Sequence, residues 1–402
     1  MGKVLFYEVK ELDKKNTFLD FLIKTVSYLL VAAVASGATF FLFGKTEGQT
    51  KLEQLEELIH ARFVGEADPT AMEDGAAAGM LASLGDQWSY YIPAADYAAH
   101  MEQMRNAYVG IGVTVENKNP KQGITVVHME PGGGAAEAGM GIGDIITEVE
   151  GQSVAQIGLD EARNLIRGEE NTTVELTVLR GEETLTLTVQ RKLIQVTVAE
   201  GFMLENGIGI VQINNFDERC AQETLAAVEE LLEKGADSLI FDVRFNPGGY
   251  QTELVDILDY LLPEGILFRS QTYVGIEEVD ESDADCLDVP MAVLINGNSY
   301  SAAEFFAAAL DEYDKAVLVG QPTTGKSYFQ STFRLNDGSA VALSVGKYFT
   351  PNGVSLAEVG GLQPEILVEV DEETAAKIYA GMVPLAEDPQ IQAAVAALKA
   401  AD

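Results

Sequence analysis

Between residues 193 and 370 the chain alternates short apolar runs with amphipathic stretches of helical period. The apolar runs are short and rich in Val, Ile and Phe, so they predict buried strands, whereas the amphipathic stretches predict helices. The expected strands are residues 207–213, 238–243, 292–295 and 316–319, and the expected helices are residues 220–234, 252–262 and a helix that starts at Ser301. Such alternation is typical of an α/β domain, a sheet covered by helices. In these folds ligands bind at the carboxyl ends of strands, where Gly248 and Ser301 fall.

Two other stretches carry a strand pattern. Residues 331–349 alternate apolar and polar positions around an Asn-Asp-Gly turn, which predicts a β-hairpin. Upstream, residues 173–179 and 184–190 alternate in the same way, after an amphipathic helix at residues 159–167. With the glycine-rich strands before that helix, they predict a separate small β domain over residues 106–192.

The N-terminal part of the chain has helical and apolar patterns. Residues 51–103 are mainly helical in pattern, with leucines at i, i+3 spacing, and packing is their expected role. Residues 25–44 carry no charged side chain and would span roughly 30 Å as a helix. Five lysines precede them, so the positive-inside rule predicts a cytoplasmic N-terminus and an extracytoplasmic remainder. A cleavable signal peptide is the alternative, but residues 40–43 prolong the apolar run and favour a retained anchor.

Charge and cysteine content exclude several classes of function. The chain has 63 acidic and 26 basic residues, a formal net charge of -37, which argues against binding of nucleic acid or of anionic lipid by a basic patch. The two cysteines, Cys220 and Cys286, form neither a disulfide framework nor a metal-ligand spacing. The sequence predicts no metal and no cofactor, and leaves open whether the two thiols pair.

Ser301 and Lys326 are the most informative candidate catalytic residues. The chain has three histidines and none follows His128, so a serine nucleophile in the C-terminal part has no histidine base near it in sequence. A lysine can replace the histidine, because burial disfavours the charged amine and lowers its pKa. Ser–Lys pairs are a known variant of the serine triad. The plainer interpretation is a helix-capping serine and a solvated surface lysine.

The segment around Lys326 also matches a phosphate-binding loop. Residues 320–327 fit the pattern G-x-x-x-x-G-K-[ST] and follow an apolar run. Such a loop must open a helix whose N–H groups hold the phosphate, whereas the residues that follow have a hairpin pattern. The nucleotide-binding alternative is therefore remote.

The residues around Ser301 can supply an oxyanion hole. Ser301 and Glu304 have the spacing of a capping box, which does not exclude chemistry. A nucleophile at a helix start has the N–H of Ala302 beside it, and the helix dipole favours developing negative charge. Gly248 or Gly249, in the Asn-Pro-Gly-Gly turn, can supply a second N–H donor.

The segments that carry these motifs are residues 84–86, 88–90, 242–249, 298–304, 320–330, 337–339 and 348–353. Together they resemble the carboxy-terminal processing (tail-specific) serine peptidase family over roughly residues 50 to 370. The resemblance implies that Ser301 is the nucleophile, Lys326 the general base and Gln330 the residue that orients the lysine. Tyr300, where the family has a small residue, and Ser327, where it has glycine, depart from the pattern and bear on specificity and rate.

Residues 106–192 resemble a PDZ domain, most specifically in the Gly-Asp-Ile-Ile segment at 143–146 and the glycine that follows it at 151. Two glycines at 133–134 replace the Ser-Pro that the family often has. The resemblance implies a groove in which a peptide's C-terminal end adds as a strand. The residues that border it are Val109, Gly110, Ile111, Gly112 and Val113, and Arg167 is a candidate for a peptide-sensing contact. A small β domain whose glycines serve only turns is the alternative.

The expected protein is a multidomain α/β chain. Its parts are a cytoplasmic N-terminus (1–24), a transmembrane anchor (25–44), a helical region (45–105), a PDZ domain (106–192), a serine peptidase core (193–370) and a helical tail (371–402) that is a candidate for homo-oligomer contacts. The expected function is a single-pass, membrane-anchored, extracytoplasmic serine endopeptidase. Its partners would be proteins or peptides with apolar C-termini. A non-catalytic PDZ scaffold that tethers such tails at the membrane is the main alternative.

Overall fold

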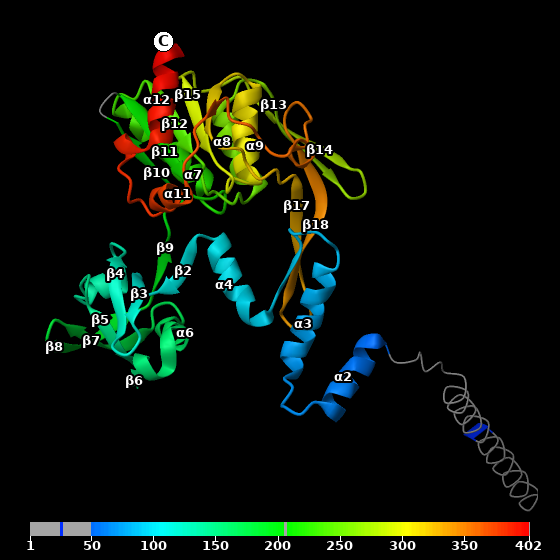
Figure 1. Cartoon of the computed structure of the whole chain (residues 1–402), viewed down its shortest axis with the longest axis vertical. Helices are drawn as coiled ribbons and strands as arrows, with labels where there is room; N and C mark the ends of the chain where they lie inside the picture. The colour runs from blue at the N-terminus through cyan, green and yellow to red at the C-terminus, as the bar shows by residue number, and fades with distance from the viewer. Residues whose placement is uncertain (1–24, 27–49, 205–206, 402) are drawn as a thin grey trace, which may run out of the picture. The chain divides into compact units, whose positions relative to one another are not determined.

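The computed structural model describes residues 25–26, 50–204 and 207–401 (Figure 1). The predicted cytoplasmic N-terminus and the predicted anchor at residues 25–44 lie outside this part of the chain, except for Thr25 and Val26. Within the described residues, no helix combines the length and the apolar character that a membrane crossing needs. The chain divides into two compact units, Met1–Met80 and Leu81–Asp402.

Two helices, α2 (Lys51–Arg62) and α3 (Pro69–Ala82), follow residue 50. A capping box starts α2: Glu53 N–H donates to the Thr50 hydroxyl at 3.2 Å, and Thr50 N–H donates to the Glu53 carboxylate at 2.7 Å. Neither helix has a buried residue. The predicted leucine stripe is present, and its members Leu52 and Leu58 are 48% and 58% exposed.

The predicted helical pattern up to residue 103 is wrong at β1 (Tyr90–Ile92). This short strand pairs antiparallel with β18 (Ala340–Phe349), with Tyr90 opposite Ala342. Aromatic and β-branched side chains favour a strand when a partner strand is available, and that partner is far away in sequence. The helix resumes after Pro93 as α4 (Ala94–Met104).

The small β domain is present where the pattern predicted it. Its sheet has the order β3-β4-β5-β7-β8, with β6 paired to β5. The strands are β3 (Val113–Asn119), β4 (Gly123–Met129), β5 (Ile145–Val149), β6 (Gln152–Ser153), β7 (Thr173–Arg180) and β8 (Glu183–Gln190), and the helices are α5 (Gly134–Glu137) and α6 (Val154–Ile166). Gly158, with φ at 83°, kinks α6, so the regular helix starts at the predicted residue, Leu159. A separate pair, β2 (Ala107–Gly110) and β9 (Lys192–Gln195), lies at the two ends of the domain's sequence.

The predicted α/β domain is confirmed. Its sheet has the order β10-β11-β12-β15-β16-β19, parallel except for β10. The strands are β10 (Ala199–Met203), β11 (Ile208–Ile213), β12 (Ser238–Asp242), β15 (Met291–Ile295), β16 (Ala316–Gly320) and β19 (Ile366–Leu367), and the helices are α7 (Cys220–Glu233), α8 (Gln251–Leu261), α9 (Ala302–Glu312) and α12 (Pro389–Ala401). The first three helices share one apolar core cluster with the sheet, while α12 contributes Ile391 to a second cluster. Burial on both faces explains the continuous apolar strands.

A second sheet in the same unit contains the predicted hairpin. It has the order β1-β18-β13-β14, with β17 paired to β18. Its other strands are β13 (Gly265–Thr272), β14 (Glu277–Ser282) and β17 (Tyr328–Arg334). Because β17, and not a helix, follows Lys326, the match to a phosphate-binding loop lacks the helix N-terminus that would hold a phosphate. The nucleotide-binding alternative is therefore wrong.

The C-terminal tail is helical as predicted, in α11 (Glu372–Tyr379), a 3₁₀ turn η1 (Leu385–Glu387) and α12; the remaining short helix is α10 (Leu356–Val359). The tail is also bonded to the sheet. Arg244, at the end of β12, forms ion pairs with Asp242 at 2.6 Å and with Asp388 at 2.9 Å, and all three side chains are buried. The two cysteines are free thiols, Cys220 buried and Cys286 partly buried.

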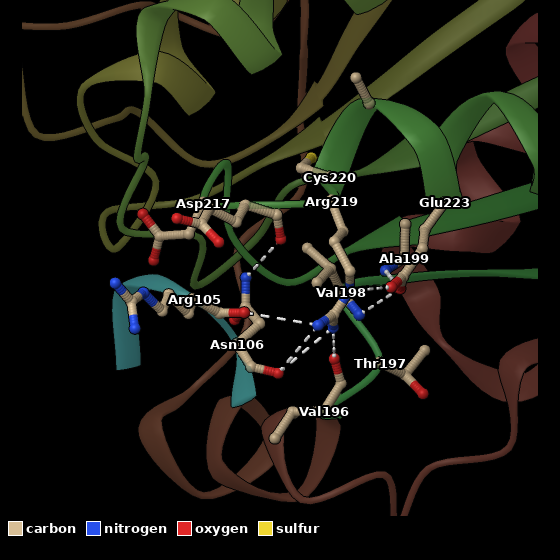
Figure 2. A network of polar contacts seen from close by, with 12 residues as sticks. Arg105, Asn106, Val196, Thr197, Val198, Ala199, Asp217, Arg219, Cys220 and Glu223 are labelled. Atoms are coloured by element: carbon tan, nitrogen blue, oxygen red, sulfur yellow. Dashed lines mark hydrogen bonds and ion pairs between the residues drawn. The ribbon is translucent and has the colours of Figure 1, made fainter. Parts of the chain in front are cut away.

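Figure 2 shows a polar network at the points where the chain enters and leaves the small β domain. Arg219, directly before α7, donates to the carbonyls of Asn106 at 3.2 Å and Val196 at 2.5 Å. Its guanidinium also pairs with Glu223 at 2.9 Å, and Glu223 accepts a hydrogen bond from Val198 N–H at 2.6 Å. One arginine therefore fixes both connections of the small β domain to the start of α7.

Candidate active site

Ser301 lies in a tight loop between β15 and α9. Its backbone has φ 59° and ψ −128°, a region that non-glycine residues rarely adopt, and its side chain is buried. The preceding Ser299 is fully buried, and its hydroxyl donates to the Val243 carbonyl at 2.8 Å and accepts from Asn296 N–H at 3.0 Å. Ser299 therefore fixes the loop, whereas Ser301 lines a cavity.

Glu304 connects the serine loop to the lysine loop. Its carboxylate accepts hydrogen bonds from Ser301 N–H at 3.1 Å, Lys326 N–H at 2.8 Å and Gly325 N–H at 2.6 Å, as well as from the Thr323 hydroxyl. The residue is completely buried, and burial raises the pKa of its carboxyl, against these hydrogen bonds. The capping box predicted from the spacing is present at the start of α9, and the same carboxylate also bonds to the lysine loop. Glu304 therefore positions both candidate catalytic loops.

The Gly248–Gly249 turn lies against Ser301. A Cβ placed on Gly248 would be 2.7 Å from Ser301 Cβ and 2.9 Å from Ala302 N, so this close approach requires glycine. Gly248 N–H donates to the Asn246 side chain at 2.8 Å, so this predicted oxyanion donor is already in use. Among the described residues, no hydrogen-bond partner is found for the N–H of Gly249 or Ala302. These two remain as candidate donors.

Lys326 lies against two aromatic rings. Its Nζ is 4.5 Å from the centroid of the Trp88 ring and 5.8 Å from that of Tyr300. Burial lowers the pKa of Lys326 to about 8, although the negative charges of Asp86 and Glu304 act in the opposite direction. An amine with this pKa is neutral in a useful fraction of molecules near neutral pH, which a general base requires.

Gln330 is connected to Lys326 indirectly, by hydrogen bonds that lead to Asp86. Its amide donates to the Ser344 hydroxyl at 3.0 Å and to the Tyr328 carbonyl at 3.1 Å. Ser344 N–H donates to Ser89 Oγ at 3.0 Å, and Ser89 in turn donates to Asp86 at 2.6 Å. Among the described residues, neither Gln330 nor Ser301 makes a hydrogen bond with Lys326 Nζ, so the direct bonds expected from the sequence are not formed here.

Sequence reasoning assigned only packing to residues 51–103, and this was wrong for Asp86 and Trp88. Both lie beside Lys326, one as a charge and one as a ring. The available signal was that Trp88 is the only tryptophan of the chain and lies in a segment shared with the family pattern.

One cavity of about 660 Å³ brings the candidate catalytic residues together. Its lining includes Ser301, Lys326, Gln330, Gly248 and Gly249. A hydroxyl, a partly neutral amine and the glycine turn that carries the candidate donor Gly249 line one cavity, and the other candidate donor, Ala302 N–H, directly follows the nucleophile in sequence. These are the components of acyl transfer. Tyr300, one of the two residues that depart from the family pattern, also lines this cavity.

A second cavity, of about 290 Å³, lies in the small β domain. Its lining includes four of the five predicted groove residues, namely Gly110, Ile111, Gly112 and Val113, and side chains of α6 that include Leu159 and Ile166. Val109 is not part of the lining and pairs with Leu193 across β2 and β9. Arg167 lies at the edge, 5.8 Å from the Tyr108 ring and paired with Glu102 at 3.4 Å.

Fold and site together define a peptidase of the serine type with an attached peptide-binding domain, and comparisons with known proteins agree. Residues 207–368 match the family model of Peptidase family S41, residues 99–179 that of the PDZ domain, and residues 33–95 that of the activating protease CtpB N-terminal domain.

Two curated relatives extend the similarity along the chain. The carboxy-terminal processing protease CtpA of Bacillus subtilis (strain 168) is 32% identical over 359 residues, covering 86% of this chain and 76% of that protein. A probable CtpA-like serine protease of Staphylococcus aureus (strain COL) is 29% identical over 373 residues, covering 89% and 73%. A solved structure, the photosystem II D1 C-terminal processing protease, is similar with a TM-score of 0.46 and 26% identity, over 79% of this chain and 86% of that one. The chain belongs to the carboxy-terminal processing proteases of peptidase family S41, and it is a serine-type peptidase with a PDZ domain.

Proposed function

We propose that this chain is a membrane-anchored, extracytoplasmic endopeptidase that binds apolar C-terminal tails in its PDZ groove and cleaves the bound proteins with Ser301 and Lys326. The observation that carries the catalytic part is that a partly buried lysine, with a pKa lowered to about 8, shares one cavity with a strained, buried serine at a helix start. The absence of any histidine after residue 128 supports the same assignment.

In the proposed mechanism, the neutral amine of Lys326 accepts the proton of the Ser301 hydroxyl as Oγ attacks the scissile carbonyl carbon. The N–H groups of Ala302 and Gly249 stabilise the negative oxygen that develops. The C–N bond then breaks, and the Lys326 ammonium returns its proton to the leaving amine. Water attacks the resulting ester, again with Lys326 as base, and releases the carboxylate product and free Ser301.

A catalytic hydrogen bond from Ser301 to Lys326 requires a rearrangement of the lysine side chain. In this structure the amine packs on Trp88, and the amide of Gln330 donates to Ser344. If the amine moves toward Ser301, it can also donate a hydrogen bond to the side-chain oxygen of Gln330. We propose that peptide binding in the PDZ groove favours this shift, with Arg167 as the contact at the groove's edge that senses the peptide.

The groove supports recognition of an apolar tail. Leu159 and Ile166 of α6 form its apolar side, while the backbone of residues 110–113 forms the other. A C-terminal peptide can add as a strand to that backbone and place apolar side chains against α6.

The membrane part of the proposal is supported by the uncharged residues 25–44 and the lysines before them. Membrane fractionation of tagged full chain tests that part, and recovery in the soluble fraction would contradict it.

The catalytic proposal is tested with a purified reporter protein that ends in an apolar tail. The full chain, Ser301→Ala and Lys326→Ala are each incubated with it, and the new terminus of any product is identified by mass spectrometry. The proposal predicts an internal cut near the C-terminus by the unmodified chain and none by either variant. Tail binding without any cleavage by the unmodified chain would instead support a PDZ scaffold.

A further inference from the structure

Asp217 is an acidic side chain in the wall of the catalytic cavity. It lies in the loop between β11 and α7, is 7% exposed, and lines the same cavity as Ser301 and Lys326. Its backbone is held on both sides: its N–H donates to the Asn215 side chain at 2.9 Å, and its carbonyl accepts from Cys220 N–H at 3.1 Å. The backbone position of Asp217 is therefore fixed by the loop.

This loop also touches the turn that carries the candidate oxyanion donors. A Cβ placed on Gly249 would lie 2.6 Å from Asp217 N, while a Cβ placed on Gly248 would lie 2.7 Å from Ser301 Cβ. Two successive glycines thus separate Asp217 from the nucleophile. Asp217 and Ser301 therefore border the same glycine turn and line the same cavity, which a substrate residue next to the scissile bond can enter.

The Asp217 carboxyl has an unmet need for a hydrogen-bond donor. Its Oδ1 is buried, and among the described residues it has no hydrogen-bond partner. Burial raises the pKa of this carboxyl to about 7, and the negative charges of Glu218 and Glu253 add to the effect. The neighbouring Arg219 does not relieve it, because its guanidinium pairs with Glu223 and with backbone carbonyls (Figure 2).

The surroundings of Asp217 suit a long side chain with a cationic end. Met101, Met104, Tyr90 and Tyr250 line the same cavity. Burial raises the pKa of both tyrosines, and the charge of Asp217 adds to the effect, so both hydroxyls lie within electrostatic range of the carboxylate. Apolar walls that end at a buried acid can take the methylene stem of a lysine or arginine, with its charged group on the acid.

We infer that Asp217 is a specificity-determining residue that binds a lysine or arginine side chain of the substrate next to the scissile bond. The inference rests on the proposed function, since it assigns part of the substrate to the same cavity. It is compatible with an apolar C-terminal end, because that end would bind in the PDZ groove. A cationic side chain would supply the donor that Oδ1 lacks and would compensate the negative charge there.

The test uses reporter proteins that share one apolar C-terminal end. In each pair of reporters, one position near the mapped cut carries either lysine or methionine, and the positions are tested one at a time. Values of kcat/KM are measured for the full chain, for Asp217→Asn and for Glu218→Gln, a matched change at the exposed neighbour. We expect lysine at one position to be favoured about tenfold or more by the unmodified chain and by Glu218→Gln. Asp217→Asn should cut the two tails at similar rates and retain cleavage of the methionine tail.

Three results would overturn the inference: no preference in the unmodified chain, an unchanged preference in Asp217→Asn, or an equal loss on both tails in that variant. The last result would mean that Asp217 has only a structural role.

A binding assay separates the inference from the proposed function. Ser301→Ala is titrated with C-terminally amidated fluorescent peptides, which lack the carboxylate for the PDZ groove and contain lysine or norleucine.

Tighter binding of the lysine peptide, abolished by adding Asp217→Asn, would support the cationic subsite even if the unmodified chain cleaves nothing. Equal binding of the two peptides would contradict the subsite even if cleavage is observed. The two hypotheses therefore fail on different measurements.

Discussion

The groove of the PDZ domain and the candidate catalytic cavity differ in what lines them, so the proposed function assigns them different means of binding a peptide. The groove, of about 290 Å³, has backbone from residues 110–113 on one side and apolar side chains of α6 on the other. The cavity, of about 660 Å³, has side chains with specific chemistry, above all Ser301, Lys326 and Asp217. The groove thus offers main-chain hydrogen bonds, which no substitution of a side chain removes, whereas each function of the cavity depends on one or two atoms.

This difference predicts unequal sensitivity to substitution. A peptide that adds as a strand gains most of its affinity from main-chain bonds and a broad apolar contact, so single changes at the groove should have small effects. In the mechanism proposed for the cavity, the nucleophile and base act as a unit, so loss of either should remove most of the rate enhancement. We therefore expect the largest effects of substitution in the cavity and the smallest at the groove.

The largest effect is expected for Ser301→Ala. Cleavage of an apolar-tailed reporter should fall by more than about a thousandfold, because the variant has no nucleophile. Binding of the tail, followed by fluorescence anisotropy, should stay unchanged, because the groove is formed by other residues. Residual cleavage within tenfold of the unmodified chain would assign the nucleophile to another residue.

A smaller but broad effect is expected for Glu304→Gln. A glutamine has one acceptor oxygen, so some of the buried donors from Ser301, Lys326, Gly325 and Thr323 would lose their partner. We expect a loss of about 2 to 3 kcal/mol in the free energy of unfolding. Displacement of the two loops should also lower kcat, on the order of tenfold to a hundredfold.

Glu312→Gln is the matched control for this change. Glu312 is on the same helix and accepts hydrogen bonds from the Thr350 hydroxyl and Asn352 N–H, away from the cavity. Glu312→Gln should lower the free energy of unfolding, measured in urea, without a comparable change in kcat. Equal kcat losses in the two variants would show that Glu304 acts only through stability.

The smallest effect is expected for Arg167→Ala at the groove. Its ion pair with Glu102 is exposed and contributes little, so KM for an apolar-tailed substrate should rise about two- to fivefold. Arg163→Ala, at the same groove but paired with Asp160 on its own helix, should change KM less. A slight fall in kcat is expected as well for Arg167→Ala, because Arg167 is the proposed peptide-sensing contact; a kcat that stays unchanged would contradict that role.

Local patterns were sufficient to predict much of the fold. The strands of the α/β domain, α9 at Ser301 and the β17–β18 hairpin follow from apolar periodicity and turn residues, which are properties of short segments. Strand β1 could not be predicted, because its partner β18 is far away in sequence. The same holds for β13 and β14, whose charged and polar residues do not alternate clearly.

The candidate site shows the same limit. The spacing and residue types pointed to Ser301 and Lys326, and the structure places both at one cavity. The pattern could not show that Glu304 would bond to the lysine loop. Nor could it show that the charge of Asp86, which precedes the PDZ domain in sequence, would act on the pKa of Lys326. These contacts depend on how distant segments pack, and no local pattern encodes such packing. Asp217 was missed for the same reason.

The central claim is that Lys326 is available as a neutral base. It is tested most directly by NMR titration of the full chain with ¹³C-labelled lysine, with the Lys326 signal assigned from its loss in Lys326→Arg. The account predicts a midpoint near 8, because burial disfavours the ammonium, and a lower midpoint in Asp86→Asn, which removes a charge that favours it. The fraction of neutral amine, and with it kcat/KM, should rise as pH increases through that midpoint. A midpoint that remains near 10.5, the ordinary value for lysine, would contradict the account.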